Sequence, residues 1–320
     1  MKAKIGKWLS ILLPIVLGLG LVLYTYFKFT PEQLEEIKIQ FQNANYIYIY
    51  ISLLISAISL WSRGYRWKYS LAHLGYTPKI STNVMAVCIG YFVNMSVPRS
   101  GEVSRALLLK KYEDVPFDKA FGTIIAERIV DSIFLLSFII LAFFLEFDVL
   151  QQFVLDKVSL QTLSLIGILG ILGLILSFYI LKYSKFRWVI LFKEKIAGLL
   201  DGVLSIWNME NKWAFIVHSF LIWACYFFMF YITIFALPET SNLALSTVII
   251  AFIVGGLAIT LTNSGFGAYP FLMSEILLLY QIPETAGTAF GWMVWTSQTL
   301  MVVILGTLSF LLLPILNKNK

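Results

Sequence analysis

The chain has 320 residues, of which 59% are hydrophobic and 13% charged, whereas a soluble domain carries about 25% charged residues. This composition excludes a water-soluble globular protein. The net charge of +6 does not indicate nucleic-acid binding, because the basic residues flank apolar segments instead of gathering on one soluble domain. Both cysteines, Cys88 and Cys225, lie inside apolar runs without metal-ligand spacing, so we expect them to be buried hydrophobic residues. We therefore expect an all-α, polytopic integral membrane protein.

Two apolar segments, residues 9–27 and 46–62, are expected to form the first two membrane-spanning helices. Basic residues precede the first segment and follow the second, and acidic residues lie in the linker between them. Because Lys and Arg mark cytoplasmic loops, we expect the N-terminus and the second loop to be cytoplasmic. The residues behind this assignment are Lys2, Lys4 and Lys7, then Glu32, Glu35 and Glu36, and then Arg63, Arg66, Lys68 and Lys79.

Residues 82–97 form a shorter apolar stretch that ends at Pro98 and has basic residues on both sides. If both flanks are cytoplasmic, residues 82–109 cannot form one simple span. A hairpin that enters the membrane and returns fits better, provided that protein or a wet cavity surrounds its non-helical backbone. We therefore predict a re-entrant hairpin over residues 82–109.

The rest of the chain contains further apolar segments. Residues 119–145 are expected to run to the outside and residues 159–181 to return. Residues 182–212 are rich in charge and repeat apolar residues at steps of three and four, which predicts an amphipathic helix on the cytoplasmic surface. Four further segments complete a total of about eight spans: 213–236, 243–262, 265–282 and 286–313. The basic residues at the end place the C-terminus in the cytoplasm. We expect residues 1–320 to form one domain.

Two interruptions of the apolar pattern stand about half a chain apart. Ser100-Gly101 and Ser264-Gly265 each follow an apolar run that carries an asparagine, Asn94 in the first and Asn263 in the second. Paired breaks in corresponding halves indicate a transporter's binding site near the midplane. Similarity between the halves is thin beyond these residues, which leaves an internal repeat open. The second break begins residues 265–282, which we expect either to span or to re-enter.

The segment Pro98-Arg99-Ser100-Gly101-Glu102-Val103-Ser104-Arg105 is the strongest polar signal. Ser100 is a good N-cap, and a helix that starts there would present unpaired N–H groups and its positive dipole end. With Arg99 beside it, this end is a candidate anion site. Glu102 and Arg105 would share a helix face and could pair. The alternative is an ordinary cytoplasmic loop with basic residues.

Three charged residues, Glu127, Arg128 and Asp131, lie within the otherwise apolar segment 119–145 and can face one side of a helix. Each charge costs about 2.5–3.5 kcal/mol at the bilayer centre, so we expect a partner or a wet cavity instead of lipid. The alternative is a structural ion pair that holds helices together. Glu275 is a further carboxylate at membrane depth, and it is either a proton-coupling group or an interface residue.

The sequence offers no positive evidence for catalysis. It contains no HExxH, GxSxG or P-loop pattern, and His73 and His218 have no second ligand at metal spacing. We therefore expect no enzymatic activity, no cofactor and no metal site.

The sequences PRSGEVSRALLL and ERIVD resemble the Pro-Arg-x-Gly-Glu and Glu-Arg-x-x-Asp pattern of the flippase-like transmembrane domain of lysylphosphatidylglycerol synthases. In the full-length synthases this domain is thought to move aminoacylated phospholipid between leaflets, while a separate soluble domain transfers the amino acid. The resemblance implies a stand-alone translocator without that soluble domain. A second family motif departs, because Pro270 stands where the pattern leads us to expect a glutamate, and this puts shared substrate and proton coupling in question.

The resemblance and the charge pattern together predict a polar cavity in the cell membrane for the headgroup of a phospholipid or a polyprenyl-linked molecule. Arg99 and Arg128 are expected to bind phosphate, and Glu102 and Asp131 to orient them. The full set of predicted substrate-binding residues is Arg99, Glu102, Arg105, Glu127, Arg128, Asp131, Asn94, Asn263, Gly265 and Gly267. The alternative function is a membrane scaffold or partner subunit of a lipid- or glycan-modifying enzyme.

Overall fold

The computed structural model describes residues 2–147, 206–262 and 264–318, together with single residues between 172 and 190. The chain forms two compact units, one from Met1–Ile125 with Met209–Lys320 and one from Ala126–Asn208. In the described residues every regular element is helical, which confirms the all-α membrane protein. Four of these helices are long and apolar enough to cross a membrane, namely α3 (Tyr46–His73), α6 (Phe117–Leu145), α10 (Lys212–Thr233, continued by the 3-10 turn η1, Ile234–Ala236) and α13 (Glu284–Leu316).

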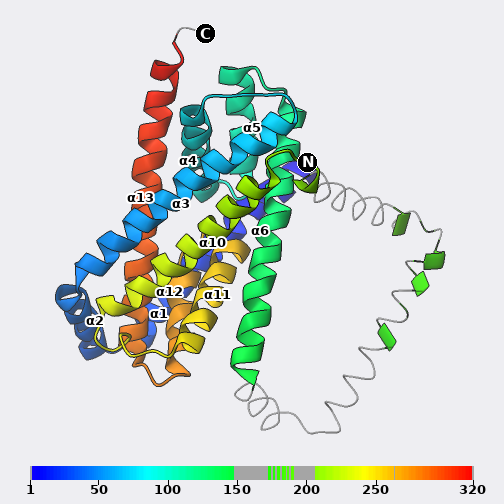
Figure 1. Ribbon diagram of the computed structural model, residues 1–320. Coiled ribbons are helices and arrows are strands. Elements are labelled where there is room, and N and C mark those ends of the chain that lie inside the picture. Colours follow the sequence, from blue (N-terminus) through cyan, green and yellow to red (C-terminus); the bar gives the residue numbers. More distant parts are fainter. Residues whose placement is uncertain are drawn as a thin grey trace. The chain divides into compact units, whose positions relative to one another are not determined.

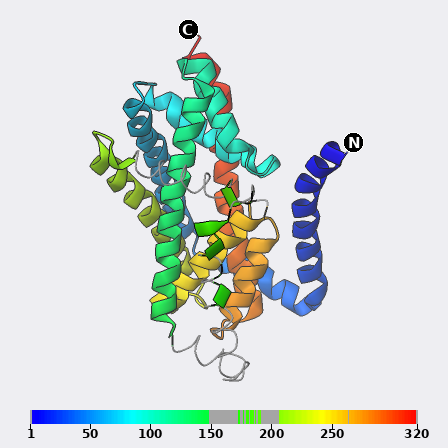
Figure 2. The same cartoon turned by 90° about the vertical axis from the view of Figure 1, so that its right-hand side faces the viewer.

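The linker between the first two predicted spans is itself helical. Helix α1 (Lys2–Lys28) is followed by α2 (Pro31–Asn43), whose N-cap Thr30 exchanges side-chain and backbone hydrogen bonds with Gln33 in a capping box. No residue of α2 is fully buried, and its apolar Ile37 and Phe41 pack against the core. Figure 2 shows α2 turning away from α1 towards the start of α3. Its 13 residues are too few to span, so α2 has the form of an interfacial helix.

Helix α3 corrects the second prediction, because it continues to His73 instead of ending near residue 62. Arg63 and Arg66, expected in a cytoplasmic loop, lie inside this helix and are buried. They belong to a stripe of buried residues that recur along α3 at alternating steps of four and three residues, as in a heptad repeat. The stripe consists of Ser52, Ser56, Ser59, Arg63, Arg66 and Ser70. Small residues at such positions let helix backbones approach closely in a membrane. Helix α10 packs alongside α3 (Figure 1).

The hairpin predicted over residues 82–109 is present as α4 (Ile80–Ser96) and α5 (Ser100–Glu113), joined by a three-residue turn. Its open end is tied by the backbone N–H of Lys79, which donates to Oε1 of Glu113 at 3.3 Å. At 1.5 Å per residue, α5 is about 21 Å long, which is shorter than the hydrocarbon core of about 30 Å. The structure thus confirms a helical hairpin, and its entry from the cytoplasmic side stays a prediction.

The second interruption is also a helical hairpin. Helix α11 (Leu245–Leu261) and helix α12 (Ala268–Leu278) flank a turn in which Ser264, Gly265 and Gly267 have positive φ angles. Because α12 has only 11 residues, residues 265–282 do not form a full span. Of the two possibilities left open for this segment, the structure favours the interrupted, re-entrant form.

The order long, short, short, long occurs twice along the chain, in α3–α4–α5–α6 and in α10–α11–α12–α13. The offset between corresponding helices stays between 165 and 168 residues, as their first residues show: Tyr46 and Lys212, Ile80 and Leu245, Ser100 and Ala268, Phe117 and Glu284. Helices α4 and α11 each have 17 residues. The layout of helices therefore supports the internal repeat. Most of the predicted segment 159–181 and more than half of the predicted segment 182–212 lie outside the described residues.

Candidate functional site

The tip of the α4–α5 hairpin is held by a contact between Asn94 and Gly101. The Gly101 N–H donates to Oδ1 of Asn94 at 2.7 Å, and a Cβ on Gly101 would overlap the carbonyl oxygen of Gly90. Gly90 and Asn94 are four residues apart on α4, so both face α5. Only glycine at position 101 permits this approach of the two backbones. Asn94, predicted to bind substrate, thus has a structural role at the tip.

The first turn of α5 differs from the predicted anion site. The helix begins at Ser100 with Arg99 as its N-cap, and Arg99 adopts the left-handed region with φ of 62°. The Ser100 N–H donates to the carbonyl oxygen of Val97 at 3.2 Å, and Gly101 donates to Asn94. The first two N–H groups of α5 are therefore not unpaired, because the hairpin turn itself supplies their acceptors. Arg99 is exposed beside them, and its binding of an anion stays a prediction.

Arg105 occupies the interior of the same unit. Its guanidinium carbon lies 4.1 Å from the centre of the Trp67 ring, and its side chain is 3% exposed. The opposite side of its aliphatic stem packs on Gly90, where a Cβ would come within 2.9 Å of Cγ of Arg105. Trp67 is itself fixed, since its Nε1 donates to Oγ1 of Thr123 at 2.8 Å. Glu102 is half-buried one turn earlier on α5.

Two further arginines, Arg63 and Arg66, reach from α3 to α10. Nη1 of Arg66 donates to Oγ of Ser219 at 2.9 Å, and its guanidinium lies 5.1 Å from the centre of the Phe215 ring. Nη2 of Arg63 donates to the hydroxyl of Tyr226 at 3.1 Å. Arg63, Arg66 and Trp67 fall within little more than one turn of α3, and Arg105 of α5 stacks on Trp67, so three arginines are buried within the first unit.

Sequence reasoning missed Arg63 and Arg66 as site residues, because a basic residue at the end of an apolar run usually marks a loop. The spacing of the buried stripe of serines and arginines on α3 was the signal that could have placed them in a helix. His218 of α10 contacts residues of α3. Its Nδ1 is 2.7 Å from Oγ of Ser62, and its ring stacks on Tyr65.

Glu127, Arg128 and Asp131 lie in the second unit, on α6. Nη1 of Arg128 is 4.0 Å from Oδ2 of Asp131, as their spacing of three residues on one helix face predicts. Glu127 and Asp131 are buried, whereas the side chain of Arg128 is 37% exposed. Their contact with substrate stays a prediction.

The turn between α11 and α12 contains the two predicted glycines. Gly267 faces the backbone of α1, because a Cβ there would overlap the carbonyl oxygen of Gly18. At Gly265 an added Cβ would lie 3.1–3.3 Å from Ile259, Tyr269 and Trp295. Both glycines are therefore explained by close packing within the protein. Asn263, the remaining predicted residue, lies outside the described residues.

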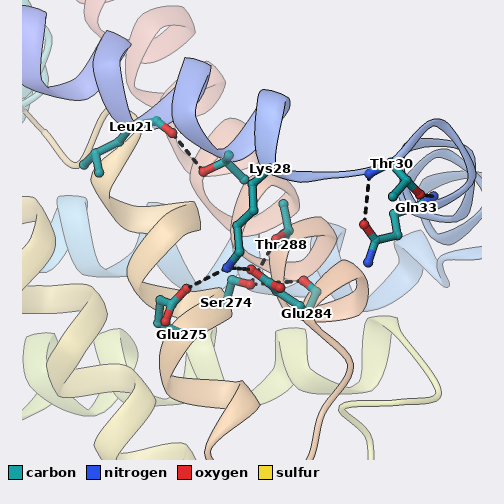
Figure 3. Close-up of polar contacts among 9 residues, drawn as sticks. Leu21, Lys28, Thr30, Gln33, Ser274, Glu275, Glu284 and Thr288 are labelled. Atoms are coloured by element: carbon teal, nitrogen blue, oxygen red, sulfur yellow. Dashed lines mark hydrogen bonds and ion pairs between the residues drawn. The ribbon is translucent and has the colours of Figure 1, made fainter.

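A separate charged cluster joins the end of α1 to α12 and α13 (Figure 3). Nζ of Lys28 is 3.5 Å from Oε1 of Glu275 and forms a closer ion pair with Glu284. Behind the carboxylates, Oγ of Ser274 accepts from Thr288 and donates to the backbone carbonyl of Glu284, each at 3.0 Å. The side chain of Glu275 is 42% exposed, so the structure favours the interface role for this residue.

Two comparisons with known proteins bear on this arrangement. The family model described as the lysylphosphatidylglycerol synthase TM region matches residues 11–306. The chain belongs to this family. A UPF0104 membrane protein of Methanocaldococcus jannaschii is 25% identical over 277 residues, which cover 78% of this chain and 79% of the relative. No solved structure matches.

Membership of the lysylphosphatidylglycerol synthase TM region family confirms the resemblance of the two charged motifs. In this member, Pro270 takes the third position of α12, in the first turn, where a missing N–H costs no helical hydrogen bond. The charges of the first hairpin, Arg99, Glu102 and Arg105, have no counterpart in the turn and first turn of the second. Within the described hairpins, the two halves therefore share a layout and differ in charge.

Proposed function

We propose that this chain moves an anionic lipid, or a lipid-linked molecule with an anionic headgroup, between the leaflets of the cell membrane, without catalysing a covalent reaction. The observation that carries the proposal is the burial of three arginines, Arg63, Arg66 and Arg105, inside the protein, at 2%, 0% and 3% exposure. Both termini are assigned to the cytoplasm by the basic residues beside them. The substrate class is a phospholipid or a polyprenyl-linked molecule.

Arg63 and Arg66 lie where arginines are rarely found in a membrane helix. Near the end of a span, a long basic side chain usually extends to the headgroups and keeps its charge in water. Arg63 and Arg66 point into the α3–α10 seam instead. In a medium of low dielectric, the attraction between a buried guanidinium group and an anionic headgroup is stronger than in water. The planar guanidinium groups match phosphate oxygens with two parallel hydrogen bonds.

The two hairpins support transport as well. Many transporters bind their substrates near the bilayer midplane, at the turns of interrupted helices that occur in corresponding halves of a repeat. The hairpins α4–α5 and α11–α12 have this form and recur at a nearly constant offset. Movement of one half relative to the other would expose the arginines to each leaflet in turn.

One observation favours the scaffold alternative. Arg63 and Arg66 bond to Tyr226 and Ser219, so they also join α3 to α10. A purely structural arginine that spans two helices tolerates lysine better than one that grips phosphate with a planar fork. The two functions therefore differ in the response to a charge-preserving change.

The deciding experiment reconstitutes the full chain into liposomes with fluorescent phosphatidylglycerol and follows headgroup access from outside. Wild type, Arg105→Lys, Arg128→Ala and Arg128→Lys are compared, with Lys110→Ala, an exposed position of α5, as the matched control. Transfer that is lost in folded Arg105→Lys and kept in Lys110→Ala supports translocation through this site. The response of the two Arg128 variants reports on α6 separately. Transfer kept in every variant, or absent from wild type with each anionic lipid tested, favours the scaffold.

A further inference from the structure

A groove on an exposed apolar face of the first unit is distinct from the arginine site. It has a volume of about 410 Å³ and lies between α2, α3 and α13. Phe41 of α2 and Tyr46 of α3 form one end, and α13 lines its length from Met293 to Leu305. We infer that this groove holds a single acyl chain of a bilayer phospholipid, whose headgroup lies beside α2. The inference does not depend on lipid translocation.

The chemistry of the wall excludes a polar occupant. The described lining residues are all uncharged. Of their hydroxyl groups, that of Tyr46 donates to the carbonyl oxygen of Phe41 at 2.7 Å, and that of Ser297 donates to Val294 at 3.0 Å. These two hydroxyls are already bonded to backbone and present their carbon atoms to the groove. A phosphate, a sugar or an ion would lose its hydration there without receiving a charged partner.

The dimensions of the groove select a hydrocarbon chain over a helix. The 12 steps from Met293 to Leu305 correspond to about 18 Å along α13. A volume of 410 Å³ open to the centres of water molecules over this length, with the radius of a water molecule added on each side, corresponds to a channel about 8 Å wide, whereas an α-helix with its side chains is about 10–12 Å across. A helix from a second copy of this chain therefore does not fit inside. One leaflet contributes about 15 Å of hydrocarbon, which is close to the length of the groove.

The position of α2 orients the occupant. This short helix has charged residues on its exposed side, including Glu35 and Lys38, which form an ion pair at 3.0 Å. An amphipathic helix of this kind lies at the level of the headgroups. The tyrosines at positions 46 and 50 begin α3 next to it, as aromatic residues do at a membrane interface. The groove therefore starts at the interface and continues along α13 into the hydrocarbon layer.

The first test maps the lipid directly on the unmodified protein. The full chain is placed in phosphatidylcholine nanodiscs that contain phosphatidylcholine with a photoreactive diazirine in one acyl chain, and the adducts are located by mass spectrometry. We expect adducts to concentrate on Leu300 and Ile304, compared with Leu308 and Leu312, which are exposed on the same helix beyond the groove. Equal labelling of all four positions overturns the inference.

A variant test separates the groove from the general lipid surface. Ser297→Trp fills the groove and is expected to reduce labelling at Ile304 severalfold, while Leu308→Trp, beyond its end, leaves that labelling unchanged. Unchanged labelling in Ser297→Trp overturns the inference. Replacing the probe with diazirine-bearing phosphatidylglycerol should give the same pattern, because the wall recognises the chain. Labelling that occurs with only one headgroup also overturns it. None of these readouts requires transport, so their failure and the failure of translocation are distinguishable.

Discussion

The guanidinium group of Arg105 lies 4.1 Å from the centre of the Trp67 ring and thereby connects the charged hairpin to the interior of α3. Stacking on an indole face stabilises a desolvated cation by about 2 kcal/mol. Because both side chains are buried, this contact contributes to holding α5 against α3.

Replacing Arg105 with glutamine is expected to lower the free energy of unfolding by about 2 kcal/mol, because the stacked cation is lost and the indole face keeps a weaker partner. Thermal unfolding in detergent, followed by intrinsic fluorescence, measures this change. Lys110→Gln removes a charge from the exposed side of the same helix and should leave the midpoint unchanged. Equal midpoints for the two variants would show that the stacked cation contributes nothing.

The close contact between Gly101 and Gly90 at the tip of the α4–α5 hairpin can be tested by adding a single methyl group. Gly101→Ala places a Cβ onto the carbonyl oxygen of Gly90, so we expect a loss of about 1–3 kcal/mol from overpacking. Gly122→Ala is the matched control, since a Cβ at this α6 position meets nothing within 4 Å. Alanine is the better helix former by about 1 kcal/mol, so the control should be neutral or slightly stabilising. Only Gly101→Ala should therefore lower the thermal midpoint, and an equal decrease in both variants argues against the close contact.

The ion pair between Lys28 and Glu284 is expected to contribute little to stability. Both side chains are partly exposed, at 35% and 22%, and such pairs contribute about 0–1 kcal/mol. A double-mutant cycle with Lys28→Ala and Glu284→Gln, measured by chemical unfolding in detergent at low and high salt, gives the coupling energy. We expect a small coupling that decreases with salt. A coupling of several kcal/mol, unaffected by salt, would mean that the cluster is shielded from water.

The membrane class, the first hairpin and the position of the second interruption were predictable from local sequence. Pro98 with basic flanks indicated the first hairpin, and Gly265 with Gly267 indicated the second, because each interrupts an apolar run at a residue that suits a turn. Helix α2 was missed although Thr30 and Gln33 form a capping box, since its acidic residues suggested a loop. These features depend on neighbouring residues, so sequence alone carries them.

The arginine site was only partly predictable, because its geometry comes from residues that are distant in sequence. Arg105 was identified from its motif, whereas nothing local shows that it stacks on Trp67. Arg66 meets Ser219 across 153 residues, and the rule that assigns basic residues to loops concealed this contact. The interruption at Gly265 and Gly267 was visible in the sequence, but the approach of Gly18 to Gly267 depends on the packing of α1. Tertiary pairing of this kind has no local signature.

The hydroxyl of Tyr226 joins three helices, because it accepts from Arg63 of α3 at 3.1 Å and lies 2.9 Å from the hydroxyl of Tyr91 of α4. Tyr226→Phe removes both hydrogen bonds, whereas Tyr91→Phe removes only the second. Hydrogen bonds to charged groups contribute about 1.5–3 kcal/mol and neutral ones about 1 kcal/mol, so we expect Tyr226→Phe to be the more destabilising change.

Thermal unfolding of Tyr226→Phe, Tyr91→Phe and the double variant separates the two bonds. In the double variant, Tyr91→Phe no longer removes the bond to Tyr226, so its loss of stability should be smaller than the sum of the two single losses. Additive losses would contradict the shared hydroxyl. The liposome assay with Tyr226→Phe also distinguishes a role of Arg63 in lipid transfer from a role in packing alone. A folded variant with slower lipid transfer indicates that the orientation of this arginine matters for the substrate, and unchanged transfer assigns the bond to packing of α3 against α10.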